Sequence, residues 1–166
     1  FTHPAVITPN ARDALMQADA IVITPGTYYC TLLPVLMVEG VSDVLMAKQV
    51  PIILVLNCLN RKGHTEDWKA SDYIHGLESV MRRNVTHVLM NNEPLTEEQK
   101  TQYELNDTSG LQIHDDVIGD ARILRLPLLS QDTIHRSSTD VLAKHRAFIR
   151  HDSQKVAAAL VSILGV

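Results

Sequence analysis

Four short apolar runs along the chain have the length and composition of buried strands. They are Ala20–Ile23, Pro51–Asn57, Thr86–Met90 and Ala121–Leu126. Each is rich in aliphatic residues, and the second contains Ile-Ile-Leu-Val-Leu with no polar residue between them. A strand of this kind is covered on both faces, which is typical of parallel sheets.

The segments between these runs carry helical spacing, cap residues and helix breakers. The first predicted helix follows Thr8-Pro9, and the second runs from Leu32 to Lys48 with a break at Gly40. Ser71 is expected to cap the next helix, which runs to about Arg83, and two further helices cover Leu95–Tyr103 and Gln154–Leu164. Strands that alternate with helices in this way predict a single α/β domain. Its sheet is expected to be mainly parallel, with helices on both faces.

One stretch, Asp19–Pro34, predicts a strand, a loop and the start of a helix. The strand ends at Thr24-Pro25-Gly26-Thr27, which fits neither strand nor helix periodicity. Thr31 is placed to cap the helix, and Pro34 falls early enough that its missing N–H has little effect. A glycine whose backbone is free to approach a ligand, next to a helix N-terminus, suits an anionic group such as phosphate. A tight turn that binds nothing is the alternative interpretation.

Ligands of open parallel sheets bind beyond the carboxyl ends of the strands. This rule places three polar loops, Thr24–Thr31, Asn57–Thr65 and Asn91-Asn92, at one edge of the predicted sheet. Asparagine offers a donor and an acceptor for a base edge or a sugar, although each asparagine could instead bind its own backbone. The candidate ligand-binding residues are Pro25, Gly26, Thr27, Tyr28, Thr31, Asn57, Asn60, Gly63, Thr65, Asp72, Asn91 and Asn92.

Two further groups of residues offer other chemistry. Arg61, Lys62 and His64 could form a cationic pocket for a diphosphate, or they could be solvated loop residues. The trio His114-Asp115-Asp116 could ligate a metal, but it lacks the spacing of a dedicated metal site, and a solvated turn is expected. Neither group predicts a metal site or a catalytic residue.

Composition limits the class of protein. A length of 166 residues suits one domain, and a net charge of −4 gives no basic surface for nucleic acid or an anionic membrane. The apolar runs are too short to cross a bilayer and no signal-peptide pattern opens the chain, so a cytoplasmic location is expected. Cys30 and Cys58 are too few for a disulfide scaffold and are expected to be free thiols that pack as small apolar groups.

Several motifs occur in a characteristic order and spacing. They are Ala18–Thr31, Leu33-Pro34, Val38–Val41, Asn57-Cys58-Leu59, Gly63-His64-Thr65, Ala70–Tyr73, His151-Asp152 and Lys155–Ala157. Together these motifs resemble the second half of the 2-phospho-L-lactate transferase superfamily, and the likeness extends from about Pro4 to Leu164. Within that superfamily, the chain is more similar to the branch called gluconeogenesis factor, or nucleotide-sugar-binding proteins, than to the transferases.

The resemblance implies a Rossmann-like three-layer fold, a nucleotide-type ligand and homo-oligomers. Members of the superfamily open with a glycine-rich strand–loop–helix that holds phosphates, and this sequence contains no such segment. Residues 1–166 are therefore expected to form one α/β domain that corresponds to the C-terminal half of a longer family fold. The expected partners are a nucleotide or nucleotide sugar, and a second copy of the chain or the missing N-terminal half.

The resemblance leaves three possible functions, one for each branch of the superfamily and one for a half-domain. The gluconeogenesis-factor branch implies nucleotide or nucleotide-sugar binding that regulates carbon metabolism and cell-envelope growth, with no assigned reaction or cofactor. The transferase branch implies transfer of a phospholactate group from a guanylate donor to a deazaflavin with Mg²⁺, for which the strand-end edge offers Asp72 and Glu66-Asp67. The third function is that of a half-domain that pairs with another chain and binds no ligand alone.

Overall fold

The computed structural model describes residues 3–105, 112–130 and 149–166. At its centre is a sheet of parallel strands in the order β1-β2-β3-β4. The strands are β1 (Ile21–Ile23), β2 (Ile52–Val55), β3 (His87–Asn91) and β4 (Ile123–Leu126). Each strand coincides with or overlaps one of the predicted runs, so the α/β fold with a parallel sheet is confirmed.

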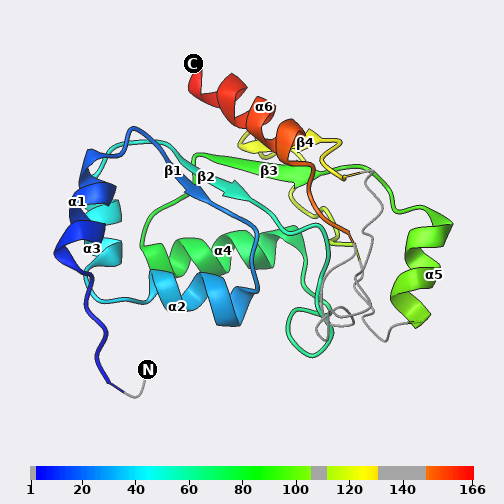
Figure 1. Ribbon diagram of the computed structural model, residues 1–166, viewed down its shortest axis with the longest axis horizontal. Coiled ribbons are helices and arrows are strands. Elements are labelled where there is room, and N and C mark those ends of the chain that lie inside the picture. The colour runs from blue at the N-terminus through cyan, green and yellow to red at the C-terminus, as the bar shows by residue number, and fades with distance from the viewer. Residues whose placement is uncertain (1–2, 106–111, 131–148) are drawn as a thin grey trace, which may run out of the picture.

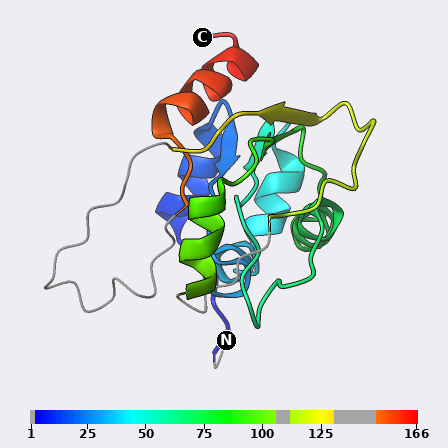
Figure 2. The ribbon, with the colours of Figure 1, turned by 90° about the vertical axis from the view of Figure 1, so that its right-hand side faces the viewer.

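Helices cover both faces of the sheet (Figures 1 and 2). Helix α6 (Ser153–Leu164) packs on one face, whereas α2 (Leu33–Leu36), α3 (Val41–Ala47) and α4 (Ala70–Met81) pack on the other. The other helical elements are α1 (Pro9–Gln17), a π-helical turn η1 (Tyr28–Leu32) and α5 (Glu97–Leu105). Within the described ranges, no helix combines the length with the apolar character that a membrane span requires.

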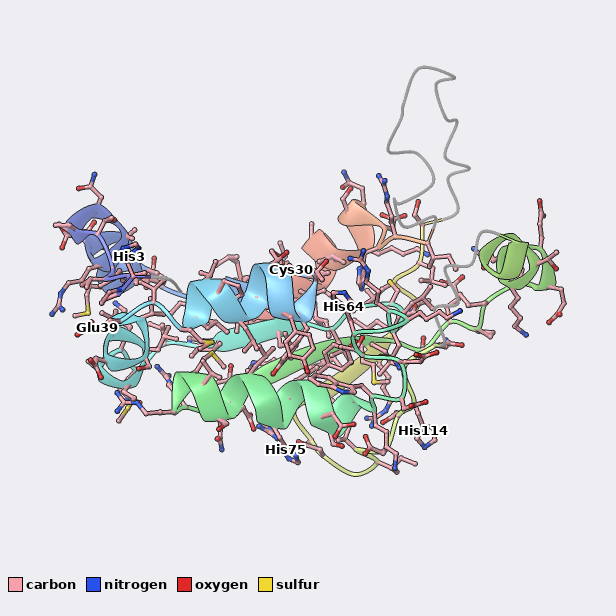
Figure 3. All side chains as sticks on the ribbon, turned by 90° about the horizontal axis from the view of Figure 1, so that it is seen from below. His3, Cys30, Glu39, His64, His75 and His114 are labelled. Atoms are coloured by element: carbon pink, nitrogen blue, oxygen red, sulfur yellow. The ribbon has the colours of Figure 1, made fainter. Side chains whose placement is uncertain are left out.

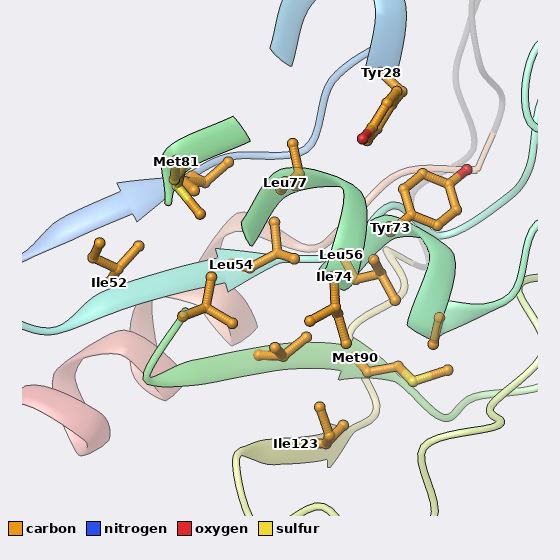
Figure 4. Close-up of a cluster of buried hydrophobic side chains, with 14 of the residues drawn as sticks. Tyr28, Ile52, Leu54, Leu56, Tyr73, Ile74, Leu77, Met81, Met90 and Ile123 are labelled. Carbon is orange, nitrogen blue, oxygen red and sulfur yellow. The ribbon is translucent and has the colours of Figure 1, made fainter. Parts of the chain in front are cut away.

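Alternate residues of β2 enter two separate cores. On one face, Ile52 and Leu54 pack with Ile74 and Leu77 of α4 (Figure 4). On the opposite face, Ile53 belongs to the core that α6 covers. None of these five side chains is more than 1% exposed. The burial of β2 on both faces explains why its sequence shows no polar alternation.

The predicted break at Gly40 separates α2 from α3. Gly40 has φ +89°, and a Cβ at this position would lie 2.8 Å from Cγ2 of Ile7. Ile7 is held there because its N–H donates to the carbonyl of Glu39 (2.9 Å), while the N–H of Glu39 donates to the carbonyl of Ala5 (2.9 Å). Both the backbone conformation and this close contact therefore require glycine.

Helix α4 begins one residue before the predicted cap, Ser71. Its first residue is Ala70, and the N–H of Lys69 donates to Oδ2 of Asp72 (2.8 Å). The N–H and the hydroxyl of Ser71 both donate to the carboxylate of Asp116 (3.0 and 2.6 Å). The prediction of Ser71 as the cap was wrong because a carboxylate 45 positions away in the sequence occupies that role.

The helix after β1 also begins earlier than predicted. Its first residue is Tyr28, so Thr31 lies inside the helical turn and does not cap it. The carbonyl of Thr27 accepts from the N–H of Thr31 (2.7 Å) and from the N–H of Leu32 (3.2 Å), which widens the turn into η1. Pro34 lies in the first turn of α2, as predicted.

The trio His114-Asp115-Asp116 connects the segment before β4 to β4 itself and to α4. The carboxylate of Asp115 accepts two hydrogen bonds from the guanidinium of Arg125 (2.5 and 3.0 Å), which hold the pKa of that carboxyl below its usual range. Asp116 binds the first turn of α4 through Ser71. Two members of the trio therefore have structural partners in β4 and α4.

Candidate functional site

The loops that follow β1 and β2 are joined by a pair of hydrogen bonds. The N–H of Gly26 donates to Oδ1 of Asn57 (3.0 Å), and Nδ2 of Asn57 donates to the carbonyl of Gly26 (2.9 Å). The backbone of Gly26 is therefore occupied, in contrast to the expectation that it is free to approach a ligand. Close packing explains the glycine, because a Cβ would lie 3.2 Å from side-chain atoms of Thr31 and Leu32.

Two of the predicted ligand-binding residues are buried and form hydrogen bonds that hold the loop after β2 in place. Asn60 and Thr65 are buried, and the hydroxyl of Tyr73 lies 2.9 Å from Oδ1 of Asn60 and 2.8 Å from Oγ1 of Thr65. Nδ2 of Asn60 also donates to the carbonyl of Trp68 (2.7 Å), and Oγ1 of Thr65 accepts from the N–H of Arg61 (3.1 Å). Burial raises the pKa of Tyr73, so its phenol stays neutral and available as a donor.

An aromatic cluster connects the two loops to α4. The ring of Tyr28 lies 4.6 Å from that of Trp68, 5.1 Å from that of Tyr29 and 5.8 Å from that of Tyr73, each in edge-to-face geometry. Tyr28 is only 5% exposed, whereas Tyr29 is 48% exposed. Of the two adjacent tyrosines, the predicted Tyr28 is therefore a core residue, and Tyr29 presents its ring to solvent.

Four side chains from the two loops border this cluster at the surface, and we call them the β1–β2 rim: Thr27, Tyr29, Arg61 and His64. Nη1 of Arg61 donates to Oγ1 of Thr27 (3.4 Å), and the His64 ring lies 6.3 Å from the ring of Tyr29. Figure 3 labels His64 and also Cys30, which follows Tyr29. Nδ1 of His64 is buried, and no described residue forms a hydrogen bond with it. The rim thus combines a cation, an aromatic face and an unsatisfied polar atom.

The third predicted loop, Asn91-Asn92, forms hydrogen bonds with residues in and just after β4. Nδ2 of Asn91 donates to the carbonyl of Glu93 (2.9 Å), and Oδ1 of Asn91 accepts from the N–H of Leu128 (3.0 Å). Nδ2 of Asn92 makes a longer contact with the carbonyl of Arg125 (3.4 Å). The bond from Asn91 to Glu93 is local, as the alternative interpretation predicted, whereas the other bond of Asn91 and the contact of Asn92 join backbone groups 37 and 33 positions away.

Of the four remaining candidate ligand-binding residues, three are exposed and one has a structural role. Pro25, Thr31 and Gly63 are exposed in the first two loops, and Gly63 has φ +70°. Asp72 caps α4. Of the three residues offered for a cationic pocket, Arg61 and Lys62 are exposed and His64 is half-buried. The list of candidate ligand-binding residues did not include Tyr29 and Trp68. The signal that could have shown them is that the single tryptophan and two adjacent tyrosines fall in the loops after neighbouring strands.

Cys58, in the loop that follows β2, lies against His151. Its Sγ is 3.4 Å from each ring nitrogen of His151. Burial raises the pKa of Cys58 to about 12, so the sulfur is a thiol and not a thiolate near neutral pH. Cys30, by contrast, is exposed, and the expectation that it is a buried apolar group was wrong. It lies in η1, two residues after the buried Tyr28.

Residues 2–134 match the family model described as 2-phospho-L-lactate transferase CofD. The chain belongs to the CofD family. Its relatives include the gluconeogenesis factor of Bacillus subtilis (strain 168), which is 28% identical over 157 residues that cover 94% of this chain and 46% of the relative. The putative gluconeogenesis factor of Thermotoga maritima is 28% identical over 161 residues, covering 97% of this chain and 49% of the relative.

The fold of this CofD-family chain also matches a solved structure. A crystal structure of a UPF0052 family member from Bacillus halodurans superposes with a TM-score of 0.78 at 20% identity and covers 94% of this chain and 47% of that chain. The chain spans about half the length of the relatives that it matches and corresponds to their C-terminal half, as the sequence predicted.

We expect the free energy of unfolding of this CofD-family chain to depend on pH, because the folded chain buries His151. Burial lowers the pKa of His151 below its ordinary value of 6.5. The unfolded chain therefore takes up a proton below about pH 6.5 that the folded chain does not, and stability falls from that pH downward by at most about 1.4 kcal/mol per pH unit. We expect His151→Gln to reduce this slope in urea unfolding between pH 7 and pH 5. His75→Gln, at an exposed position on α4, is the matched control and should keep the slope; equal slopes in both variants would refute the assignment.

Proposed function

We propose that the chain binds a nucleotide or nucleotide sugar at the β1–β2 rim and regulates carbon metabolism and cell-envelope growth without catalysing a reaction. The observation that carries the proposal is the pair of hydrogen bonds between Gly26 and Asn57, which holds the two loops at a constant distance from each other. The names of the B. subtilis and T. maritima relatives support a role in carbon metabolism.

The rim has groups for two parts of such a ligand. The guanidinium of Arg61 can pair with a phosphate, since planar guanidinium donors match phosphate oxygens. The exposed ring of Tyr29 offers a surface on which a base can stack. A nucleotide suits both groups at once, because it joins an anion to an aromatic ring.

Phospholactate transfer is the second candidate, and the CofD family model is the observation that favours it. Such a reaction with Mg²⁺ needs carboxylates that converge on the metal. Asp72 caps α4, and Oε2 of Glu66 accepts from the N–H of Gly63 (3.4 Å). Across the described ranges, no three histidine, cysteine or acidic side chains are close enough together to hold a metal ion. Asp72 and Glu66 are thus both engaged in hydrogen bonds within the fold, and we derive no step through Mg²⁺.

Ligand binding can be followed through the single tryptophan. Trp68 packs against Tyr28 and Tyr29, so a ligand that covers Tyr29 should change its fluorescence. We expect UDP-glucose, GDP or NAD to give saturable heat in isothermal titration calorimetry and a saturable change in Trp68 emission, with a Kd below about 1 mM. Arg61→Ala should weaken this binding about 10-fold, because a charge-assisted hydrogen bond is lost.

Arg82→Ala is the matched control for the Arg61 variant. Arg82 is exposed beyond the end of α4, where it pairs with Asp43, and should have no effect on the Kd. If none of the three ligands gives a saturable signal at millimolar concentration, the proposal fails. If Arg61→Ala and Arg82→Ala bind equally well, the ligand does not bind at the rim.

A further inference from the structure

Three asparagine side chains that could read the edge of a base are engaged within the fold. Asn57 and Gly26 exchange two hydrogen bonds (3.0 and 2.9 Å). Oδ1 of Asn60 accepts from the hydroxyl of Tyr73 (2.9 Å), and its Nδ2 donates to a backbone carbonyl (2.7 Å). Asn91 binds backbone groups through both Nδ2 and Oδ1 (2.9 and 3.0 Å). Because each amide already has a partner for its donor and for its acceptor, we do not assign the reading of a base edge to them.

The β1–β2 rim instead offers a base the face of one aromatic ring. Tyr29 is 48% exposed, and edge-to-face contacts with Tyr28 (5.1 Å between ring centroids) and Trp68 (5.9 Å) fix the orientation of its ring. Nδ1 of His64 is buried. The remaining asparagine of the three loops, Asn92, contacts β4, which β3 separates from β2. The ring of Tyr29 is therefore the group of the rim that we assign to the base.

The cation of the rim lies beside the loop that carries this ring. Nη1 of Arg61 donates to Oγ1 of Thr27 (3.4 Å), two residues before Tyr29. The hydrogen bonds between Gly26 and Asn57 hold the two loops together. A phosphate that pairs with Arg61 would therefore bring the attached nucleoside next to the ring of Tyr29.

Stacking and edge recognition differ in the ligands that they tell apart. Every base has a π face, so stacking on an aromatic side chain tolerates all bases and varies only with stacking strength. A site that pairs its buried polar groups with a substrate rejects an analogue that lacks the matching group by a factor on the order of 10⁴. A site that depends on the face of Tyr29 is therefore expected to accept purines and pyrimidines alike.

We propose that the β1–β2 rim binds the face of a base on Tyr29 and does not select among bases, so that its ligand class is nucleoside diphosphates, and their sugar conjugates, with any base. This inference rests on the proposed function and states which part of the nucleotide each group binds. Arg61 pairs with the phosphate, and Tyr29 stacks on the base. Purine nucleotides bind somewhat more tightly than pyrimidine nucleotides, since two fused rings cover more of the tyrosine.

A series of bases tests this on the unaltered chain. Isothermal titration calorimetry is carried out with ADP, GDP, UDP and CDP. We expect saturable heat with all four and Kd values within about 10-fold of one another, with the two purine nucleotides as the tighter pair. A larger difference between any two of them would show that the edge of the base is read. This measurement needs no substitution, so its result does not depend on the folding of a variant.

Substitutions at Tyr29 identify the ring that carries the base. Tyr29→Ala should weaken the binding of all four nucleotides at least about 5-fold, because a stacking surface is lost. Tyr29→Phe is the matched control, since it keeps the ring, and should leave each Kd within about 2-fold. Arg61→Ala should weaken all four by the same factor and leave the ratio between purine and pyrimidine nucleotides unchanged. Far-UV circular dichroism and the thermal midpoint show whether each variant is folded.

Failure of this inference and failure of the proposed function give different results. If none of the four nucleotides gives saturable heat at millimolar concentration, the proposed function fails, and this inference fails with it. If nucleotides bind but one base is preferred by more than about 10-fold, or if Tyr29→Ala binds them as tightly as the unaltered chain, the base is read elsewhere. Either of those results overturns the inference and leaves the proposed function in place.

Discussion

Gly76→Ala is expected to lower the free energy of unfolding by about 3 kcal/mol, although alanine is the better helix former. Gly76 lies in the middle of α4, and a Cβ there would be 2.2 Å from the hydroxyl oxygen of Tyr28 and 3.3 Å from the ring carbon that bears it. Tyr28 is 5% exposed and packs against Tyr73 and Trp68, so its ring has no space into which to retreat.

Removal of the hydroxyl should reverse most of this loss. In a Tyr28→Phe background, Gly76→Ala meets only the ring carbon at 3.3 Å, and the better helix propensity of alanine contributes about 1 kcal/mol. We therefore expect the two substitutions to couple by about 2 to 3 kcal/mol in a double-mutant cycle, with the double variant more stable than Gly76→Ala alone.

Urea unfolding of the four proteins measures this coupling. The thermal midpoint of Gly76→Ala should fall by about 6 to 12 °C, as expected for a domain of this size. Ser79→Ala, at an exposed position of the same helix, is the matched control and should change stability by less than about 0.5 kcal/mol. If Gly76→Ala is equally destabilising with Tyr or Phe at position 28, the contact with the hydroxyl is not the reason for glycine.

Asn57→Ala is expected to cost about 2 to 3 kcal/mol and to loosen the candidate site. The substitution removes two hydrogen bonds to Gly26, one in each direction, and leaves a partly buried N–H and C=O without partners. Because the same two bonds hold the first loop against the second, the distances within the β1–β2 rim should vary more. Ligand affinity should therefore fall more than it does in Arg61→Ala.

Two comparisons separate this effect from a general loss of stability. Asn92→Ala removes one long contact of 3.4 Å at an exposed side chain and should change stability by less than about 0.5 kcal/mol. Asn57→Asp keeps the acceptor for the N–H of Gly26 but turns a charge toward its carbonyl, so it should be no more stable than Asn57→Ala. A thermal midpoint for Asn57→Ala within 2 °C of the unaltered protein would contradict the role assigned to the pair.

Most of the fold was predictable because its determinants are close together in the sequence. The two-sided burial of β2 appears as an uninterrupted apolar run, and Thr8 and Asp152 accept hydrogen bonds from N–H groups two or three residues later, as cap residues do. Gly40 and Gly165 have positive φ at the points where helices were predicted to break or end. The errors at Ser71 and Thr31 arose where a distant carboxylate or a widened turn replaced the local cap.

The candidate site was predictable only in outline. The rule for parallel sheets correctly placed the loops after β1 and β2 together, and the hydrogen bonds between Gly26 and Asn57 confirm that these loops meet. It could not show which side chains face solvent. Asn60, Thr65 and Tyr28 are buried, whereas Tyr29 is exposed, because the widened turn η1 directs Tyr28 toward α4.

The amino-acid order alone thus settled the type, sequence and approximate limits of the strands and helices, together with membership in a family. The strands and helices depend on the burial pattern and on interactions across about four residues, whereas the family follows from the order and spacing of motifs. Assembly of the chain decided which polar groups remain available for a ligand. This depends on partners such as Asn57 for Gly26, 31 positions away, and Tyr73 for Asn60, 13 positions away, and local sequence does not identify such partners.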